Sequence, residues 1–235
     1  MEYAIILGIG IVAMITLKIA LRVKLQDVKK IKQIGEDKGL NDITNAFPEN
    51  RVVCEKILEQ LGNQNVKIKE SEDSSSKLTY YSVVTNDIVI ANIKDTFTRI
   101  QTIAHECLHS VQNRKMLLFN FIFSNLYLLY FGLIVILTLC RIIKNPILAI
   151  IIFIVLGFIY YAVRSYLEID AMTKAPYVAK EYMEKSNKIT KDKIQIIMKQ
   201  YEVINQIGIP MMNFYIFMSV FIKVIIYIGI AMMFK

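Results

Sequence analysis

The stretch Met116–Leu139, which reads MLLFNFIFSNLYLLYFGLIVILTL, sets the fold class of this chain. It contains no charged residue and is long enough to cross a bilayer as a helix, which takes about 20 apolar residues. Three further apolar runs occupy Tyr3–Leu21, Pro146–Val163 and Ile209–Phe234. Because hydrophobic residues make up 55% of the sequence and gather in these runs, we predict about four transmembrane helices rather than an ordinary soluble protein.

The first run has a second interpretation, as a secretory signal peptide. No basic stretch precedes its apolar core, and no small-residue cleavage site follows it. We therefore favour a retained membrane anchor over residues 3–21.

The net charge of +8 is distributed as in a membrane protein. Lysine and arginine gather after the first run, before the second and after the third, and cytoplasmic loops carry such an excess. Arg141 and Lys144, in the short turn between the second and third runs, weakly oppose this orientation. We predict a multi-pass protein of the cell membrane with both termini outside. The lipid bilayer is the expected partner, and we expect no nucleic acid, although a basic protein can bind it.

These patterns divide the chain into five parts. They are transmembrane helix 1 (residues 1–21), a cytosolic α+β part (22–115), a transmembrane hairpin (116–163), cytosolic helices (164–208) and transmembrane helix 4 (209–235). In the later cytosolic part we expect one helix from Arg164 that Pro176 interrupts, and another over Lys191–Gln206. The predicted fold is a mainly α membrane protein with a small α+β cytosolic domain.

Helical periodicity marks two helices early in the cytosolic α+β part. Residues 24–34 form an amphipathic helix, which lies either on the membrane surface or on the soluble body. A second helix begins near Pro48, and Gly62 is placed to cap its end.

A short antiparallel sheet is expected next. Residues 66–69 alternate as in a half-buried strand, and residues 71–77 are a polar loop. Residues 78–85 and 87–93 form a hairpin. The strand 87–93 is either an edge that pairs with extended substrate or an ordinary core or edge strand.

The sequence His105-Glu106-Cys107-Leu108-His109 precedes the second apolar run and contains both histidines of the chain. We predict a helix over Thr96–Lys115, which is able to run straight into the second apolar run. On a helix, positions i and i+4 share one face. Two imidazoles so placed can bind one zinc ion, and Glu106 can act on zinc-bound water. This motif is the strongest functional signal in the sequence.

A catalytic zinc usually takes a third protein ligand, which here must be a carboxylate, a cysteine or another oxygen donor. Because the second and third runs form a hairpin, the chain returns to the same membrane side just past Val163, and Glu168 is the first carboxylate after that return. At 1.5 Å per residue, the motif and Glu168 both lie within roughly 12 Å of the bilayer face. We favour Glu168 as the ligand over a solvated helix carboxylate.

Other polar residues have weaker signals. Asp170 points away from Glu168 on a helix, so it either orients a ligand histidine from behind or pairs with a lysine. Cys107 is interpreted as a small core residue, and the three cysteines fit no disulfide or metal spacing. Lys223 falls inside the fourth run, either as a functional charge or because the span is shifted.

The chain resembles the small membrane-embedded neutral zinc metallopeptidases of bacteria, a gluzincin-like group. The resemblance spans most of the chain and rests on residues 51–58 with Gly62, Val66, Ile68, Leu78, Thr79, Tyr81, residues 88–90, the motif with Gln112, and residues 168–171 with Ala175. The family has HE-x-G-H followed by E-x-N-A, whereas this chain has Leu108 and Asp170 at two of those positions. The resemblance implies a zincin-like domain, one Zn²⁺ held by His105, His109 and Glu168, and Glu106 as the catalytic base.

The expected function is a membrane-bound zinc endopeptidase whose site faces the cytosol. Its substrates would be unfolded or membrane-proximal peptides and proteins, and its oxyanion donor would be Tyr201, Tyr177 or Arg164, although a structural role is favoured for each tyrosine. One alternative is a sensor that cleaves a single dedicated partner. The main alternative is a non-enzymatic membrane scaffold or regulator with a structural zinc site. The sequence does not define the oligomeric state.

Overall fold

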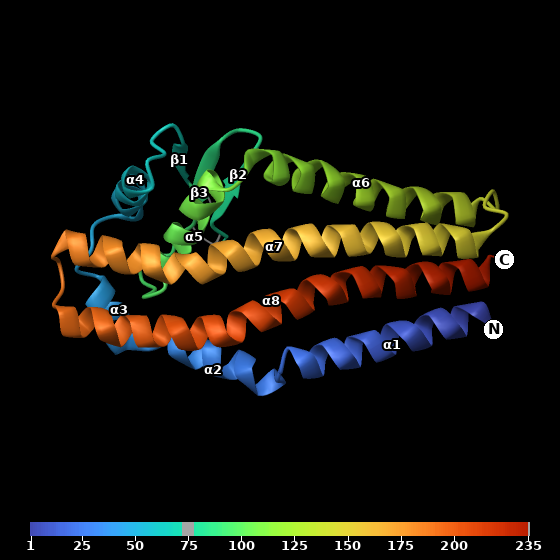
Figure 1. Ribbon diagram of the computed structural model, residues 1–235, viewed down its shortest axis with the longest axis horizontal. Helices are drawn as coiled ribbons and strands as arrows, with labels where there is room; N and C mark the ends of the chain where they lie inside the picture. The colour runs from blue at the N-terminus through green and yellow to red at the C-terminus, as the bar shows by residue number, and fades with distance from the viewer. Residues whose placement is uncertain (72–77, 235) are drawn as a thin grey trace. The chain divides into compact units, whose positions relative to one another are not determined.

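The computed structural model describes residues 1–71 and 78–234, so most of the polar loop predicted at 71–77 lies outside the described residues. The described chain is mostly helical with one small sheet (Figure 1). Its elements are α1 (Glu2–Ala20), α2 (Leu25–Gly35), α3 (Lys38–Thr44), α4 (Asn50–Gln60), β1 (Lys67–Glu70), β2 (Tyr80–Ser82), β3 (Asp87–Ile90), α5 (Arg99–Val111), α6 (Arg114–Leu139), α7 (Pro146–Ser186) and α8 (Lys191–Met233).

The chain forms two compact units. The apolar unit comprises Met1–Val23, Phe119–Tyr166 and Pro210–Lys235, and the mixed unit comprises Lys24–Leu118 and Leu167–Ile209. Helices α7 and α8 contribute to both units.

The apolar unit confirms the helices predicted from the four apolar runs. Helices α1, α6, α7 and α8 are long and apolar enough to cross a membrane, which is compatible with a multi-pass membrane protein. Large side chains such as Leu129, 68% exposed, and Phe158, 55% exposed, cover the outside of this unit. Its core combines aliphatic and aromatic side chains, with Tyr127 of α6 stacked on Phe153 of α7 at 4.8 Å between ring centroids. A surface of this kind suits lipid rather than water.

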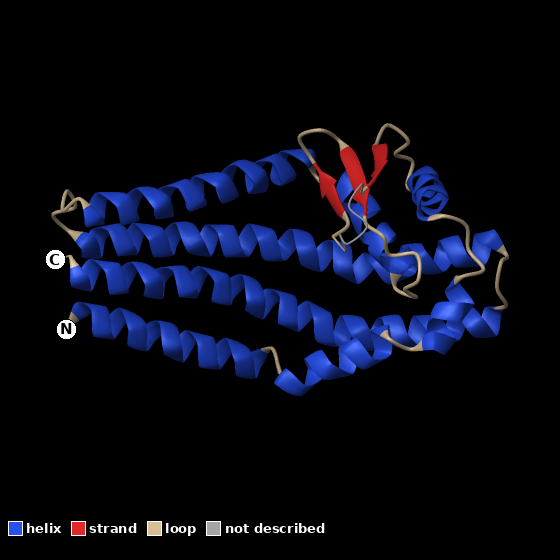
Figure 2. Ribbon diagram, turned by 180° about the vertical axis from the view of Figure 1, so that it is seen from behind, coloured by secondary structure: helices blue, strands red, loops and turns tan. Residues whose placement is uncertain are grey.

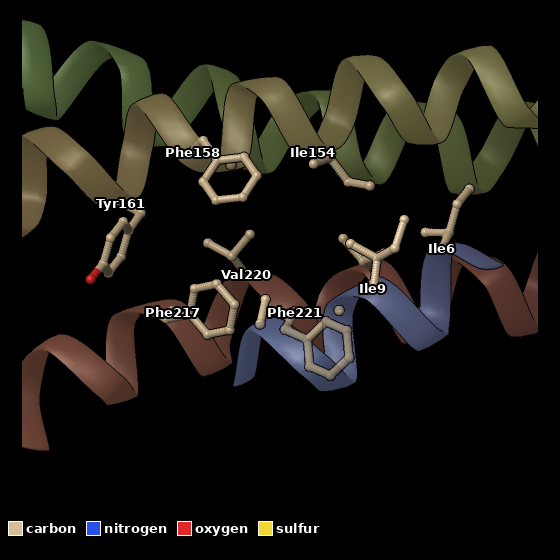
Figure 3. Close-up of a pocket in the computed structure, with 12 residues that line it drawn as sticks. Ile6, Ile9, Ile154, Phe158, Tyr161, Phe217, Val220 and Phe221 are labelled. Atoms are coloured by element: carbon tan, nitrogen blue, oxygen red, sulfur yellow. The ribbon is translucent and has the colours of Figure 1, made fainter. Parts of the chain in front are cut away.

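A cavity of about 160 Å³ lies among α1, α7 and α8 in the apolar unit (Figure 3). Ile9 from α1, Phe158 from α7 and Phe221 from α8 are among the side chains that line it. Its lining is almost entirely apolar, as expected for packing between helices of a membrane segment.

The sheet of the mixed unit has the strand order β1-β3-β2 (Figure 2). Strands β2 and β3 are antiparallel, which confirms the predicted hairpin, and Asn86 in its turn has a φ of 51°. Strand β1 pairs with β3 in parallel, so the prediction of a purely antiparallel sheet is wrong. Alternating burial identifies a strand but not its direction, which here depends on the path of the chain between β1 and β2.

The central place of β3 decides between the two interpretations of residues 87–93 in favour of an ordinary core strand. Its backbone groups pair with β1 on one side and with β2 on the other. An added peptide strand therefore has no free edge on β3. Of the two hairpin strands, β2 is the one at an edge of the sheet.

Helix α5 is held in the mixed unit by a buried arginine. The guanidinium of Arg99, fully buried, donates to the carbonyl oxygens of Thr44, Phe47 and Pro48 and to Oδ1 of Asn50, at 2.8–2.9 Å. Burial lowers the pKa of Arg99. These bonds fix the connection between α3 and α4 against the first residue of α5.

Two helix ends confirm or extend the prediction. Gly62 follows α4 with a φ of +70°, the left-handed conformation that favours glycine at a helix end. Helix α3 was not predicted from the sequence. It begins after Asp37, whose side chain accepts a hydrogen bond from the backbone N–H of Leu40, and it is too short for a clear periodicity.

The motif helix does not run into the second apolar run. Helix α5 ends at Val111, because Gln112 has an extended backbone with a φ of −66° and a ψ of 166°. The next helix begins after Asn113, whose Oδ1 accepts the backbone N–H groups of Lys115 and Met116. This break excludes the continuous helix that the sequence allowed.

Pro176 does not interrupt α7, contrary to the prediction. Proline lacks the N–H that would bond to the carbonyl four residues earlier, which belongs to Met172. In this protein Asn205 of α8 donates to that carbonyl at 2.6 Å, and its Oδ1 accepts from Gln101 of α5 at 2.8 Å. The helix therefore continues because another helix satisfies the group that proline leaves unpaired.

Candidate metal centre

Three predicted ligand residues of the mixed unit meet in one group. Helix α5 places His105 and His109 on one face, with 3.0 Å between their Nε2 atoms. Helix α7 places Oε2 of Glu168 at 3.3 Å from Nε2 of His105 and at 3.7 Å from Nε2 of His109. One ligand atom from each residue lies within 4.8 Å of the others, so this group could hold a metal ion.

The two helices that carry these residues contribute small apolar side chains to the same buried core. Ala104 and Cys107 of α5 and Ala171 and Ala175 of α7 belong to one buried core. Cys107 therefore has the core role predicted for it, and its Sγ lies 3.6 Å from Sγ of Cys54.

The ligand group is sheltered from solvent. The side chains of His109 and Glu168 are each 11% exposed, and that of His105 is 17% exposed. Burial by itself would lower the pKa of His109, but the hydrogen bond and negative charge of Glu168 outweigh it, and the net shift is upward. The group thus attracts positive charge at its centre.

Glu106 faces the same region from α5. Its Oε2 accepts a hydrogen bond from the backbone N–H of Tyr81 in β2 at 2.8 Å, and its Oε1 lies 4.0 Å from Nε2 of His105. Burial raises the pKa of this carboxyl, and the neighbouring histidines oppose the shift only in part. A buried carboxylate with a raised pKa, beside a metal-ligand group, is suited to accept and return a proton.

Asp170 and Gln112 stand behind the ligands. Oδ2 of Asp170 accepts from Nε2 of Gln112 at 2.9 Å, and Oδ1 lies 2.5 Å from Nζ of Lys174. Oε1 of Gln112 lies 2.8 Å from Nδ1 of His109. Asp170 therefore pairs with a lysine, as one prediction had it, and contacts Gln112; its role in orienting a histidine stays a prediction. The link through Gln112 was not predicted, although its place three residues after His109, on nearly the same helical face, was a signal for it.

Of the three predicted oxyanion donors, Tyr201 has a structural role in this protein. Tyr201 is fully buried, stacks on Phe97 and donates its hydroxyl to the Phe97 carbonyl oxygen at 2.9 Å, which is a structural role. Tyr177 is 69% exposed. Arg164 belongs to the apolar unit, and its role at the site stays a prediction.

Lys223 has local partners inside the apolar unit. Its Nζ donates to the carbonyl oxygen of Ser219, one turn earlier in α8, at 2.9 Å. It also lies 5.9 Å from the ring centroid of Tyr127. These contacts stabilise a lysine within an apolar helix, and they assign it no catalytic role.

Comparison of the chain with protein-family models, with curated proteins and with solved structures finds no match. The site and the sequence motif are therefore the features of this chain that point to a function.

Proposed function

We propose that this protein is a membrane-bound zinc endopeptidase, similar to the gluzincin-like metallopeptidases that its motif resembles. The observation that carries the proposal is the meeting of His105, His109 and Glu168, from two helices far apart in sequence, with Glu106 beside them. A structural metal site has no need of that fourth, buried carboxylate.

The distances among the three ligand atoms support zinc as the ion. Tetrahedral ligands that lie about 2.05 Å from one ion are about 3.3 Å from each other. The three separations here are 3.0, 3.3 and 3.7 Å. Two imidazoles and one carboxylate are also a common set for catalytic zinc, which keeps its fourth position for water or substrate.

The metal and the residues around it would then have separate roles in peptide hydrolysis. A bound zinc ion supplies Lewis acidity and lowers the pKa of water to about 7. Glu106 accepts a proton from the attacking water and returns it to the leaving amine. The N–H of Tyr81 orients this carboxylate in the resting protein.

The edge strand β2 is the proposed binding place for an extended substrate. Among the described residues, no strand pairs with β2 on the side opposite β3. Its residue Tyr81 contacts Glu106, so a peptide beside β2 would lie close to the catalytic base. Pairing with a strand edge selects extended chains, such as unfolded or membrane-proximal segments.

The central test replaces Glu106 with glutamine in detergent-purified protein. We expect Glu106→Gln to retain one zinc per chain by elemental analysis and to lose a factor of about 10²–10⁴ in cleavage of an unfolded protein substrate. Glu168→Ala should lose zinc as well as cleavage. The matched control is Glu55→Gln, on the exposed surface of α4, which should leave both unchanged. Full cleavage by Glu106→Gln would refute the proposal.

One observation favours a second candidate, a non-enzymatic protein with a structural zinc site. The hydrogen bond from Tyr81 to Glu106 ties the sheet to the motif helix, which gives this carboxylate a structural use. In that case the wild type would bind zinc without cleaving any peptide, and Glu106→Gln would chiefly lower the melting temperature.

We also propose that the site faces the cytosol, because lysine and arginine flank the apolar runs on that side. Cys140 is exposed at the end of α6, whereas Cys54 and Cys107 are buried. A membrane-impermeant maleimide should therefore label Cys140 in intact cells, and Cys140→Ser should abolish that label. Labelling only after lysis would reverse the proposed orientation.

A further inference from the structure

We infer that Gln112 is a positioning residue that selects the ring tautomer of His109 and ties the two ligand-bearing helices together. This inference rests on the proposed metal site. It assigns a role to a residue that does not itself touch the metal.

The side-chain amide of Gln112 has only one orientation that satisfies its neighbours. Its Nε2 donates to the carbonyl oxygen of Leu167 and to Oδ2 of Asp170, each at 2.9 Å. Both neighbours on α7 are acceptors, so an amide turned by 180° would press its oxygen against two oxygens. The amide nitrogen therefore faces α7, and the amide oxygen faces His109.

The orientation of the amide then determines where His109 carries its proton. Oε1 of Gln112 is 2.8 Å from Nδ1 of His109 and can only accept a hydrogen bond. Nδ1 must therefore hold the ring proton, and Nε2 of the neutral ring keeps a free lone pair. That Nε2 is the atom that points toward His105 and Glu168.

The same contacts fix the distance between the two helices at the ligands. Gln112 follows the last residue of α5, and its bonds reach Leu167 and Asp170, which lie on either side of Glu168. Lys174 holds the carboxylate of Asp170 from the next turn of α7. One side chain therefore links the histidine ligand and the glutamate ligand from behind.

A simpler role for Gln112 would be to join α5 and α7 without any effect on the metal. Gln60 offers a matched control, because its Nε2 also contacts a carbonyl oxygen of α7, that of Val178, at 3.4 Å. Gln60 lies on α4, and its amide contacts a backbone carbonyl rather than a histidine. Gln112→Met is the informative variant, since methionine has nearly the same volume and no amide.

The first experiment observes the tautomer directly in metal-free protein. The chain has two histidines, so in protein labelled with ¹⁵N-histidine only two imidazole rings contribute signals. An NMR spectrum that correlates the ring nitrogens with the carbon-bound ring protons distinguishes the two tautomers. At alkaline pH we expect the His109 ring, assigned with His109→Gln, to be protonated at Nδ1. In Gln112→Met, a shift toward the Nε2-protonated form is expected, whereas Gln60→Met should keep the wild-type spectrum. An unchanged tautomer in Gln112→Met would overturn the inference.

The second experiment measures zinc affinity by competition with a chromophoric chelator. Loss of a group that orients a ligand histidine typically weakens metal binding by about 10–100-fold, and we expect this range for Gln112→Met. Gln60→Met should bind zinc within about twofold of wild type, and circular dichroism should confirm that both variants fold. Wild-type affinity in folded Gln112→Met would refute the positioning role.

The two proposals fail in different ways. If wild-type protein binds zinc but cleaves no peptide, the proposed function fails. The zinc affinity of Gln112→Met then still decides whether Gln112 positions His109. If wild-type protein binds no zinc, the tautomer spectrum alone decides whether Gln112 controls His109.

Discussion

The mixed unit and the apolar unit differ in how several of their polar side chains are satisfied. In the apolar unit, Ser124, Asn125 and Lys223 bond to carbonyl oxygens of their own helix four residues earlier. In the mixed unit, buried polar groups bond across the fold, as Arg99 does to residues 49–55 positions away. Thr138 combines the two, since it bonds to Ile134 in its own helix and to Tyr227 of α8.

This difference indicates where the protein needs specific polar contacts. A helix in lipid must satisfy its polar groups internally, so local bonds suffice and packing does the rest. The mixed unit must hold His105, Glu106, His109 and Glu168 at fixed distances, and bonds between distant elements define that geometry. Removal of a long-range hydrogen bond should therefore lower the free energy of unfolding far more than removal of a local one.

The largest effect is expected for Arg99→Met. This change leaves four buried acceptors around the α3–α4 connection without their donor, so we expect a loss of at least about 3 kcal/mol in stability of the mixed unit. Peptide-level hydrogen exchange should show faster exchange in α4 and α5.

The control for Arg99 is Arg51→Met, which removes an exposed ion pair with Glu55 on α4. Its effect should stay within about 0.5 kcal/mol, because exposed pairs contribute little. Equal stability of the two arginine variants would show that the long-range bonds of Arg99 stabilise the mixed unit no more than an exposed ion pair does.

The next effect is expected for Asn205→Leu, which leaves the Met172 carbonyl without its donor. A buried unsatisfied acceptor costs about 1–3 kcal/mol. Adding Pro176→Ala should recover part of this loss, because alanine supplies the N–H that proline lacks. Chemical denaturation in detergent can measure both variants.

A local bond in the apolar unit gives the contrast. Ser124→Ala removes a hydroxyl that bonds to the Asn120 carbonyl of its own helix, and we expect a change within about 0.5 kcal/mol.

Failure of Pro176→Ala to improve Asn205→Leu would mean that Asn205 does not compensate for the proline.

Local features of this fold could be predicted from the sequence. The four apolar runs became helices because each is long and apolar enough by itself to fix its state. Gly62 marked the end of α4, and the hairpin around Asn86 was visible in its β-branched and aromatic residues. The grouping of Glu168 with the histidines followed from a hairpin argument that needed only chain direction.

Features that depend on distant partners could not be predicted. Pro176 signals a helix break, and the donor that prevents one lies on another helix. The parallel pairing of β1 depends on where the chain returns, which no periodicity records. Gln112 has a role only because Leu167 and Asp170 lie opposite it. These errors fall in the mixed unit, where non-local bonds dominate.

Among the long-range contacts, the smallest expected effect is a pH dependence that again belongs to the mixed unit. The hydrogen bond from Lys69 of β1, with a second from Thr85, lowers the pKa of Asp87 at the start of β3. A lowered pKa in the folded state stabilises the fold above the ordinary value of about 3.9, and this contribution disappears as the pH falls through the lowered pKa. The apolar unit has Glu2 as its one side-chain carboxylate, so mild acid should affect it less.

Asp87→Asn should therefore reduce stability at neutral pH by at most about 1 kcal/mol, because Lys69 is largely exposed. The gap between variant and wild type should narrow below about pH 4, where both lack the charge. In a Lys69→Met background, the same substitution should show a smaller dependence on pH, since the main cause of the pKa shift is gone. Hydrogen exchange of peptides from β1 and β3 at neutral and acid pH can measure this. A gap that widens in acid would show that Asp87 is destabilising when ionised, and that this cross-strand pair does not hold the sheet together.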